Sequence, residues 1–182
     1  MTDIKSKPTR DGYGDALVEM GAIDERIVVL GADLSDSTRA LWFWKKYPER
    51  FFEFGIAEQN MLNAAAGLSL AGKIPWVSTY GVFVAGRAWD QIRTTTCYSK
   101  LNVKIAGAHG GISVGPDGAT HQALEDVATM RVLPNMVVIV PCDYWETKKA
   151  VIWACKYEGP VYVRFGREPV PMITTAEDRF EM

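Results

Sequence analysis

The two histidines of the chain, His109 and His121, lie in one glycine-rich segment, twelve positions apart and with Asp117 between them. An imidazole can donate or accept a proton near neutral pH, and a carboxylate nearby can hold a hydroxyl group. Polar and glycine residues are also ordinary in loops. The segment is therefore a candidate site for polar or proton-transfer chemistry, to be weighed against a plain loop.

A second candidate is Glu58, which falls in the first turn of a helix predicted over Ala57–Ala71. The helix dipole favours an acid in the first turn, so capping is one possible role. The residues that follow, including Met61 and Leu62, are apolar, and a carboxyl at the mouth of a buried helix is expected to have a raised pKa. Such a carboxyl suits proton transfer.

Six short apolar runs predict the strands that position these residues. They are Ile27–Leu30, Phe51–Phe54, Trp76–Thr79, Val103–Ala106, Val137–Val140 and Val161–Arg164. Continuous apolar runs are typical of strands that are buried on both faces of a parallel sheet.

Longer stretches between the runs predict helices. They are Asp11–Met20, Ser37–Tyr47 (capped by Ser37 or Thr38), Ala57–Ala71, Gly86–Cys97, Gln122–Val132 and Asp143–Tyr157. This alternation predicts an α/β fold with an open, mainly parallel six-stranded sheet and helices on both faces. Ligands of such folds bind at the carboxyl ends of the strands, where the polar loops lie.

Composition excludes several classes of protein. The chain has 182 residues, 48% hydrophobic and 23% charged, which suits one domain with a real core. A net charge of −2 argues against a general nucleic-acid binder. Three scattered cysteines and two histidines do not suit a structural zinc site and indicate reduced thiols in a cytoplasmic protein. No signal peptide or membrane span is expected.

The ends of the chain are polar. We expect residues 1–8 to be flexible or disordered, residues 9–173 to form the domain, and residues 174–182 to be a linker toward a C-terminal domain that this chain lacks.

The chain resembles the pyrimidine-binding, central domain of the transketolase family, thiamine diphosphate enzymes. The resemblance covers about Thr9 to Met172 and rests on pieces in matching order. They are Thr9-Arg10, Gly31-Ala32-Asp33-Leu34 with Ser37, Phe54-Gly55-Ile56-Ala57-Glu58-Gln59-Asn60-Met61, Ser78-Thr79-Tyr80 with Phe83, Arg87-Ala88-Trp89-Asp90-Gln91-Ile92-Arg93, His109 to His121 ending in Gly115-Pro116-Asp117-Gly118-Ala119-Thr120-His121-Gln122, Arg131-Val132-Leu133-Pro134-Asn135, Pro141-Cys142-Asp143, and Arg164 to Arg167.

The resemblance implies a cofactor site. The acid that matches Glu58 hydrogen-bonds a pyrimidine ring nitrogen of thiamine diphosphate in this family, which would make Glu58 catalytic. Tyr80 and Phe83 match the aromatic wall that stacks on the pyrimidine, although core aromatics are the alternative. Asp33 belongs to the same cofactor-binding set. The family's third aromatic has no clear match, since Gly86 and Arg87 stand near its position.

The resemblance also implies a sugar phosphate site. Arg10, Ser37, His109 and Arg167 match residues that hold the phosphate, for which guanidinium groups provide paired hydrogen bonds. Asp117 matches a residue that reads a substrate hydroxyl. His121 matches the catalytic histidine beside the reacting carbonyl, the alternative being a cap for the helix that follows it.

Half of the cofactor site is missing from the sequence. The family binds the diphosphate through Mg²⁺ or Ca²⁺ with a Gly-Asp-Gly motif and a downstream Asn, and no such pair occurs here. We therefore expect no metal site in this chain. The expectation is the C-terminal subunit of a split transketolase, a transferase that acts with a diphosphate-binding partner, as a homodimer of heterodimers, on sugar phosphates.

Other hypotheses stay open at this point. The β subunit of a 2-oxo acid dehydrogenase and a deoxyxylulose phosphate synthase share the fold, the acid and the cofactor. Arg167 and Ser37, together with Thr120-His121-Gln122, favour phosphorylated sugars over the oxo acid alternative. A non-catalytic assembly module is a further hypothesis, because the chain is short.

Overall fold

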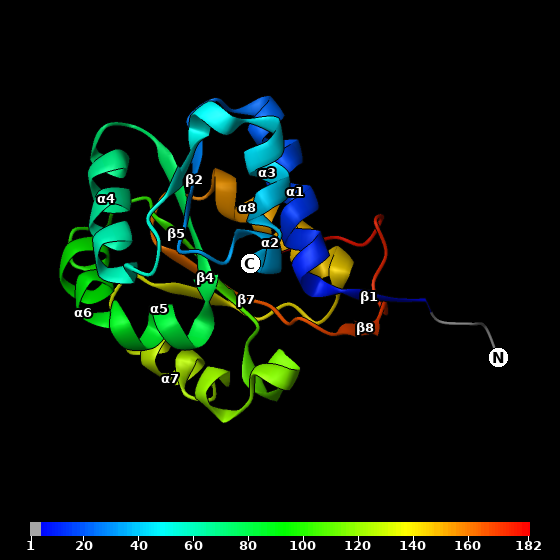
Figure 1. Cartoon of the computed structure of the whole chain (residues 1–182). Helices are drawn as coiled ribbons and strands as arrows, with labels where there is room; N and C mark the ends of the chain where they lie inside the picture. Colours follow the sequence, from blue (N-terminus) through cyan, green and yellow to red (C-terminus); the bar gives the residue numbers. More distant parts are fainter. Residues whose placement is uncertain (1–4) are drawn as a thin grey trace.

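Six parallel strands form the central sheet of the protein, which a computed structural model describes for residues 5–182 (Figure 1). The strand order is β3-β2-β4-β5-β7-β6. The bounds are β2 (Ile27–Gly31), β3 (Phe51–Glu53), β4 (Ile74–Tyr80), β5 (Lys104–Ala108), β6 (Val137–Ile139) and β7 (Val161–Arg164). Every pairing within this sheet is parallel. The predicted sheet and its six strands are confirmed, and all carboxyl ends lie at one edge.

Both faces of the sheet are buried, because successive side chains of a strand point to opposite faces. In β2, Ile27 and Val29 join one apolar cluster, while Val28 and Leu30 join the other. The first cluster is covered by α1 (Thr9–Ile23), α3 (Ala40–Lys46) and α8 (Tyr144–Lys156). The second is covered by α4 (Glu58–Leu70), α5 (Gly81–Arg87), α6 (Trp89–Gln91) and α7 (Asp126–Arg131) (Figure 1). The protein is thus a three-layer α/β fold.

The helix predicted over residues 37–47 is broken into two. The short α2 (Ser35–Thr38) ends at Arg39, whose φ of 73° is left-handed, and α3 starts at the next residue. Because a left-handed residue cannot continue an α-helix, the direction of the chain changes there. The Thr38 hydroxyl donates to the Leu34 carbonyl, so the prediction that Ser37 or Thr38 is the N-cap is wrong.

Two other helix predictions have the wrong bounds. The helix predicted from Gly86 starts at Gly81, and it continues through α6 into a π-helical turn over Ile92–Cys97. The helix predicted from Gln122 starts only at Asp126, because the chain before it forms 3-10 turns over Gly111–Asp117 and Ala119–His121. A further 3-10 turn, over Pro48–Arg50, leads into β3. By contrast, the predicted acidic cap of α8 is confirmed, because the Asp143 carboxylate accepts a hydrogen bond from the Glu146 amide.

A second, two-stranded sheet joins the ends of the domain. The antiparallel pair is β1 (Ser6–Pro8) and β8 (Pro169–Pro171). The prediction of a flexible N-terminus is therefore wrong for residues 6–8, while residues 1–4 lie outside the described part of the chain. After β8, the Ile173 and Thr174 amides donate to Asp143, and Lys149 donates to two carbonyls of the tail. Residues 173–178 thus lie against the start of α8.

The three cysteines are unpaired, as expected. Cys97 and Cys155 are buried and Cys142 is exposed. Burial raises the pKa of the Cys97 thiol to about 12, so this thiol stays protonated and inert. Within residues 5–182, no helix combines the length and the apolar character needed to cross a membrane.

Candidate active site

A hollow of about 390 Å³ opens at the carboxyl edge of the sheet. Its walls come from the loops after β2 and β3, from α5 and from the turn before Gln122. The lining residues are Ala32, Asp33, Leu34, Ile56, Glu58, Phe83, Arg87, Thr120 and His121. Four of the residues predicted from the sequence therefore share one cavity, because the parallel strands bring their following loops together.

Glu58 is the first residue of α4 and only 3% of it is exposed, as predicted. Its carboxylate accepts a hydrogen bond from Arg87 Nη1 at 2.8 Å. An unpaired buried carboxylate would carry a large desolvation cost, which this ion pair offsets. The Glu58 carboxylate is thus paired with Arg87 in the lining of the hollow.

The two predicted aromatic residues have different surroundings. The Tyr80 and Phe83 rings are nearly parallel, with centroids 5.8 Å apart. Phe83 lines the hollow, whereas Tyr80 is buried and, among the described residues, is not part of the lining. The Tyr80 hydroxyl lies 2.8 Å from the Ser37 hydroxyl. Phe83 therefore offers the ring that a ligand can reach, and Tyr80 supports it from the protein interior.

Next to the hollow, Arg10 and His109 meet at the backbone of Ser37. The Ser37 carbonyl accepts from Arg10 Nη1 at 2.9 Å and lies 3.2 Å from His109 Nε2. His109 is fully buried, and its φ of 56° is strained for a residue with a side chain. Burial, reinforced by the charge of Arg10, lowers the pKa of His109 to about 4, so the imidazole is neutral.

Arg167 approaches the same place from the loop after β7. Its Nη1 donates to the Val114 carbonyl at 3.0 Å and to Asp117 Oδ2 at 3.3 Å. The Thr9 hydroxyl accepts from the Gly166 amide at 2.7 Å and so holds the start of α1 beside this loop. Burial, with the positive charges of Arg39 and Arg167, lowers the pKa of Arg10. We call Arg10, Ser37, His109 and Arg167 the anion cluster.

His121 lies at the edge of the hollow. Its Nδ1 is 2.8 Å from the Thr120 hydroxyl, and its ring meets Phe83 edge-on at a centroid distance of 5.3 Å. The alternative role as a helix cap is wrong, because α7 starts five residues later and no side chain caps it. The Nε2 atom of His121 has no hydrogen-bond partner within residues 5–182, so it is free to meet a ligand.

Two more residues, which sequence reasoning missed, organise these loops. The Glu53 carboxylate accepts from the Asp33 and Gly55 amides at 2.7 and 2.9 Å. The buried Asp126 carboxylate accepts from Tyr162 Oη at 2.7 Å and from Arg164 Nε at 2.9 Å. The only signal in the sequence was their position, since Glu53 ends a strand and Asp126 begins a helix.

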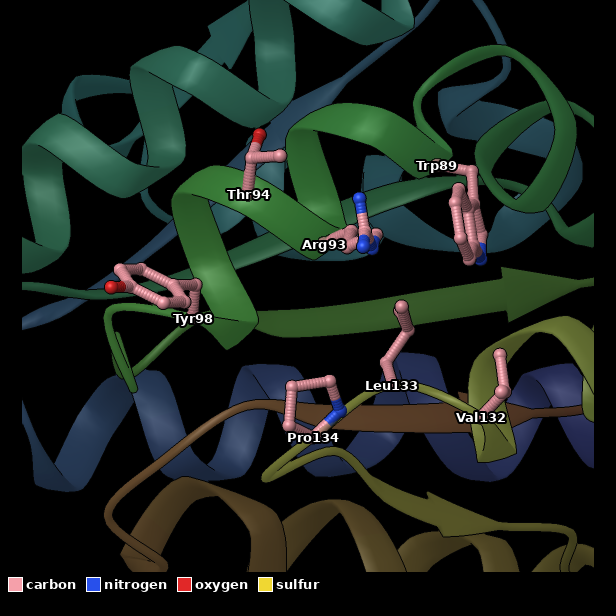
Figure 2. A pocket seen from close by; sticks show the side chains of 7 residues that line it. All are labelled: Trp89, Arg93, Thr94, Tyr98, Val132, Leu133 and Pro134. Carbon is pink, nitrogen blue, oxygen red and sulfur yellow. The ribbon is translucent and has the colours of Figure 1, made fainter.

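A larger hollow of about 670 Å³ lies elsewhere, between the helical segment 89–98 and the loop 132–134 (Figure 2). Its lining residues are Trp89, Arg93, Thr94, Tyr98, Val132, Leu133 and Pro134. The walls are mostly apolar and include no predicted site residue. The smaller hollow, where the ionisable groups converge, is therefore the candidate active site.

The described residues do not provide a metal site. Over residues 5–182, no three His, Cys, Asp or Glu side chains lie close enough together to hold a metal ion. The groups that line the hollow are two carboxylates (Asp33 and Glu58), the Arg87 guanidinium, the His121 imidazole, the Thr120 hydroxyl and the Phe83 ring.

Comparison with known proteins decides the family. Residues 5–172 match the family described as the pyrimidine binding domain of transketolase. The chain belongs to this family. Glu58 and Phe83, which the motif-based resemblance assigned to pyrimidine binding, line one hollow.

The transketolase relatives include separate subunits as well as full-length chains. The chain is 52% identical over 172 residues to a putative transketolase C-terminal section of Methanocaldococcus jannaschii, covering 94% of this chain and 54% of the relative. It is 38% identical to a 6-deoxy-6-sulfo-D-fructose transketolase subunit of a Clostridium species, covering 95% and 54%. The chain thus spans about half the length of these curated relatives.

A solved structure shows the same fold. A split gene transketolase, described as an inactive beta4 tetramer, matches with a TM-score of 0.86 and 54% identity, covering 97% of this chain and 57% of the other. The transketolase of Campylobacter jejuni matches with a TM-score of 0.86 and 25% identity, covering 94% and 27%. The α/β fold of the transketolase pyrimidine-binding domain is thereby confirmed.

Proposed function

We propose that this chain is the pyrimidine-binding subunit of a split transketolase, which transfers a two-carbon ketol unit between sugar phosphates together with a diphosphate-binding subunit. The observation that carries the proposal is the hollow where Glu58, Phe83 and His121 meet, next to the anion cluster. The similarity to a transketolase C-terminal section supports the same assignment.

The residues of the hollow fit the pyrimidine half of thiamine diphosphate. A flat heteroaromatic ring needs an apolar face to stack on and a polar group at its ring nitrogen. Phe83 and Ile56 supply apolar walls, Glu58 supplies a carboxyl group, and Asp33 lines the opposite loop. When bound, thiamine diphosphate supplies the carbon nucleophile that carries the two-carbon unit. Glu58 would hold and exchange a proton with the ring nitrogen.

The diphosphate half of the cofactor would be held by the partner subunit. We propose that Mg²⁺ or Ca²⁺ binds there, because within residues 5–182 no three His, Cys, Asp or Glu side chains lie close enough together to enclose the ion. Two such pairs would form a homodimer of heterodimers, with each cofactor shared between the two kinds of subunit.

The anion cluster would bind the charged end of the sugar. Arg10 and Arg167 are cations in a partly buried site, and a buried neutral His109 can donate or accept a hydrogen bond there. Asp117, held by Arg167, would read a substrate hydroxyl. His121, at the edge of the hollow, would bond the donor hydroxyl or the developing alkoxide.

One relative is named as a 6-deoxy-6-sulfo-D-fructose transketolase subunit, and this name suggests a sugar sulfonate as a second candidate substrate. A sulfonate carries one negative charge, whereas a phosphate monoester carries nearly two at neutral pH. The two guanidinium groups of the anion cluster favour the phosphate. The oxo acid dehydrogenase and assembly-module hypotheses are less well supported, since the curated relatives cited here carry transketolase names.

Reconstitution tests the proposed function. The chain is mixed with its diphosphate-binding subunit, thiamine diphosphate and Mg²⁺, and ketol transfer from xylulose 5-phosphate to ribose 5-phosphate is measured, with 6-deoxy-6-sulfo-D-fructose as the rival donor. We expect activity with the phosphorylated donor and a loss of at least about 100-fold in Glu58→Gln. The control is Glu49→Gln, at an exposed position. An inactive wild-type mixture, or an active Glu58→Gln, would contradict the proposal.

A further inference from the structure

Arg87 holds both of the groups that a pyrimidine ring would need. Its Nη1 donates to Glu58 Oε1 at 2.8 Å, and its guanidinium carbon lies 4.1 Å from the centroid of the Phe83 ring. Both contacts are favourable, the first as a charge-assisted hydrogen bond and the second as a cation–π interaction. Within residues 5–182, Arg87 is the only hydrogen-bond partner of the Glu58 side chain.

The position of Arg87 in the cavity supports the same conclusion. The hollow of about 390 Å³ adjoins a second one of about 530 Å³, and Ile56, Glu58 and Arg87 line both. Arg87 therefore stands at the border between the two hollows. A flat ring cannot take its contacts with Glu58 and Phe83 while the guanidinium keeps both.

The Arg87 side chain is free to leave. Glu58 is 3% exposed, whereas the Arg87 side chain is 48% exposed, and Arg87 is the last residue of α5. The guanidinium is already half-hydrated, so moving it into water costs the arginine itself little, and the ring nitrogen that takes its place offsets the cost of leaving the buried carboxylate without a cation.

We propose that Arg87 is a displaceable positioning residue, which occupies the place of the cofactor pyrimidine in the chain by itself and yields it when cofactor and partner subunit assemble. This inference rests on the proposed function. Binding then exchanges a guanidinium for a ring nitrogen at Glu58, and one proton from solvent joins the carboxyl–ring pair to replace the lost positive charge. The cofactor ring and Arg87 thus compete for Glu58, and the Arg87–Glu58 ion pair lowers the affinity for the cofactor.

Calorimetric titration of thiamine diphosphate with Mg²⁺ into the reconstituted complex tests the inference. Titrations in two buffers of different ionisation enthalpy count the protons taken up. The wild type is expected to take up about one proton on binding. In Arg87→Met no positive charge is displaced when the ring binds, so we expect no proton uptake and binding that is about 3- to 10-fold tighter. Arg87→Lys is expected to stay within about twofold of the wild type.

Arg93→Met is the matched control, because this arginine lies on the next helical segment over Trp89 and, among the described residues, has no carboxylate partner. We expect its affinity and proton uptake to equal those of the wild type. Unchanged or weaker binding in Arg87→Met with wild-type proton uptake overturns the inference but leaves the proposed function intact. A wild-type complex that binds no thiamine diphosphate overturns both.

Discussion

The Tyr80 phenol and the Ser37 hydroxyl lie 2.8 Å apart, and this hydrogen bond joins the two halves of the candidate active site. On one side, the Tyr80 ring is parallel to Phe83, which lines the hollow. On the other side, the Ser37 carbonyl is the point where Arg10 and His109 meet. The hollow that Phe83 lines and the anion cluster are therefore connected through these contacts.

Tyr80→Phe should separate these two functions. The substitution keeps the ring beside Phe83 and removes one hydrogen bond, worth about 0.5–1.5 kcal/mol. We expect the KM for a phosphorylated donor to rise by about 2- to 10-fold, while the affinity for thiamine diphosphate stays within about twofold. Phe83→Leu should do the opposite, weakening cofactor binding with little effect on the donor KM. Steady-state kinetics and cofactor titration of the reconstituted complex measure both. Equal effects of the two variants would show that the halves are not separable.

Arg167→Met should impair binding of the anionic end of the donor. A hydrogen bond to a charged group contributes about 1.5–3 kcal/mol, so the KM for xylulose 5-phosphate should rise by about 10- to 100-fold. A donor without a phosphate should be affected far less. The control is Arg131→Met, at an exposed position of α7 outside the hollow. If both classes of donor lose activity equally, Arg167 does not belong to an anion site.

His109 should make the protein less stable in acid. Its pKa is lowered to about 4 in the folded chain from an ordinary value of 6.5. Between these values the unfolded chain binds a proton that the folded chain does not, so stability falls as the pH drops from 6.5 to 4. The full effect is about 3 kcal/mol. In His109→Asn, which tolerates the left-handed backbone, this part of the pH dependence should disappear. The free energy of unfolding, measured in urea at pH 7 and pH 4.5, tests this prediction. An equal change between the two pH values in the wild type and in His109→Asn would contradict the assignment.

Gly107→Ala should destabilise the domain, because no side chain fits between β5 and Tyr162. A Cβ atom there would lie 2.1 Å from Tyr162 Oη and 2.3 Å from its ring. Forced overpacking of this kind costs about 1–3 kcal/mol or more. The matched control is Gly67→Ala on the exposed face of α4, where nothing lies within 4 Å and where helix propensity should add about 0.5–1 kcal/mol. Thermal unfolding should move in opposite directions for the two variants, and a shift of the same sign would refute this explanation.

Arg164→Met should destabilise the loop that carries Asp117 and His121. The substitution leaves the Asp126 carboxylate, which is 1% exposed, without its cation, at a cost of about 3 kcal/mol. Asp126→Asn combined with Arg164→Met should recover part of the loss. Arg179→Met, in the tail, serves as the exposed control and should leave the melting temperature unchanged. A double variant that is no more stable than Arg164→Met would show that the ion pair is not the cause.

The sequence by itself determined the sheet and the place of the site. Uninterrupted apolar runs such as Ile27–Leu30 are stable only where both faces are covered, so they predicted parallel strands between two layers of helices. The burial of Glu58 followed from the apolar residues after it. Because loops that follow parallel strands meet at one edge, the polar loops also predicted where Glu58, His121 and the anion cluster lie.

Only the tertiary structure decided which groups meet within that edge. Arg87 is 29 residues from Glu58, His109 is 72 from Ser37, and Thr9 is 157 from Gly166. No local pattern encodes such pairs, since they depend on the strand order and on the rotamers of long side chains. The break at Arg39 likewise depends on distant packing, including its ion pair with Asp11. The sequence could therefore indicate that Glu58 is a buried acid, but only the folded chain showed that the Arg87 guanidinium is paired with its carboxylate.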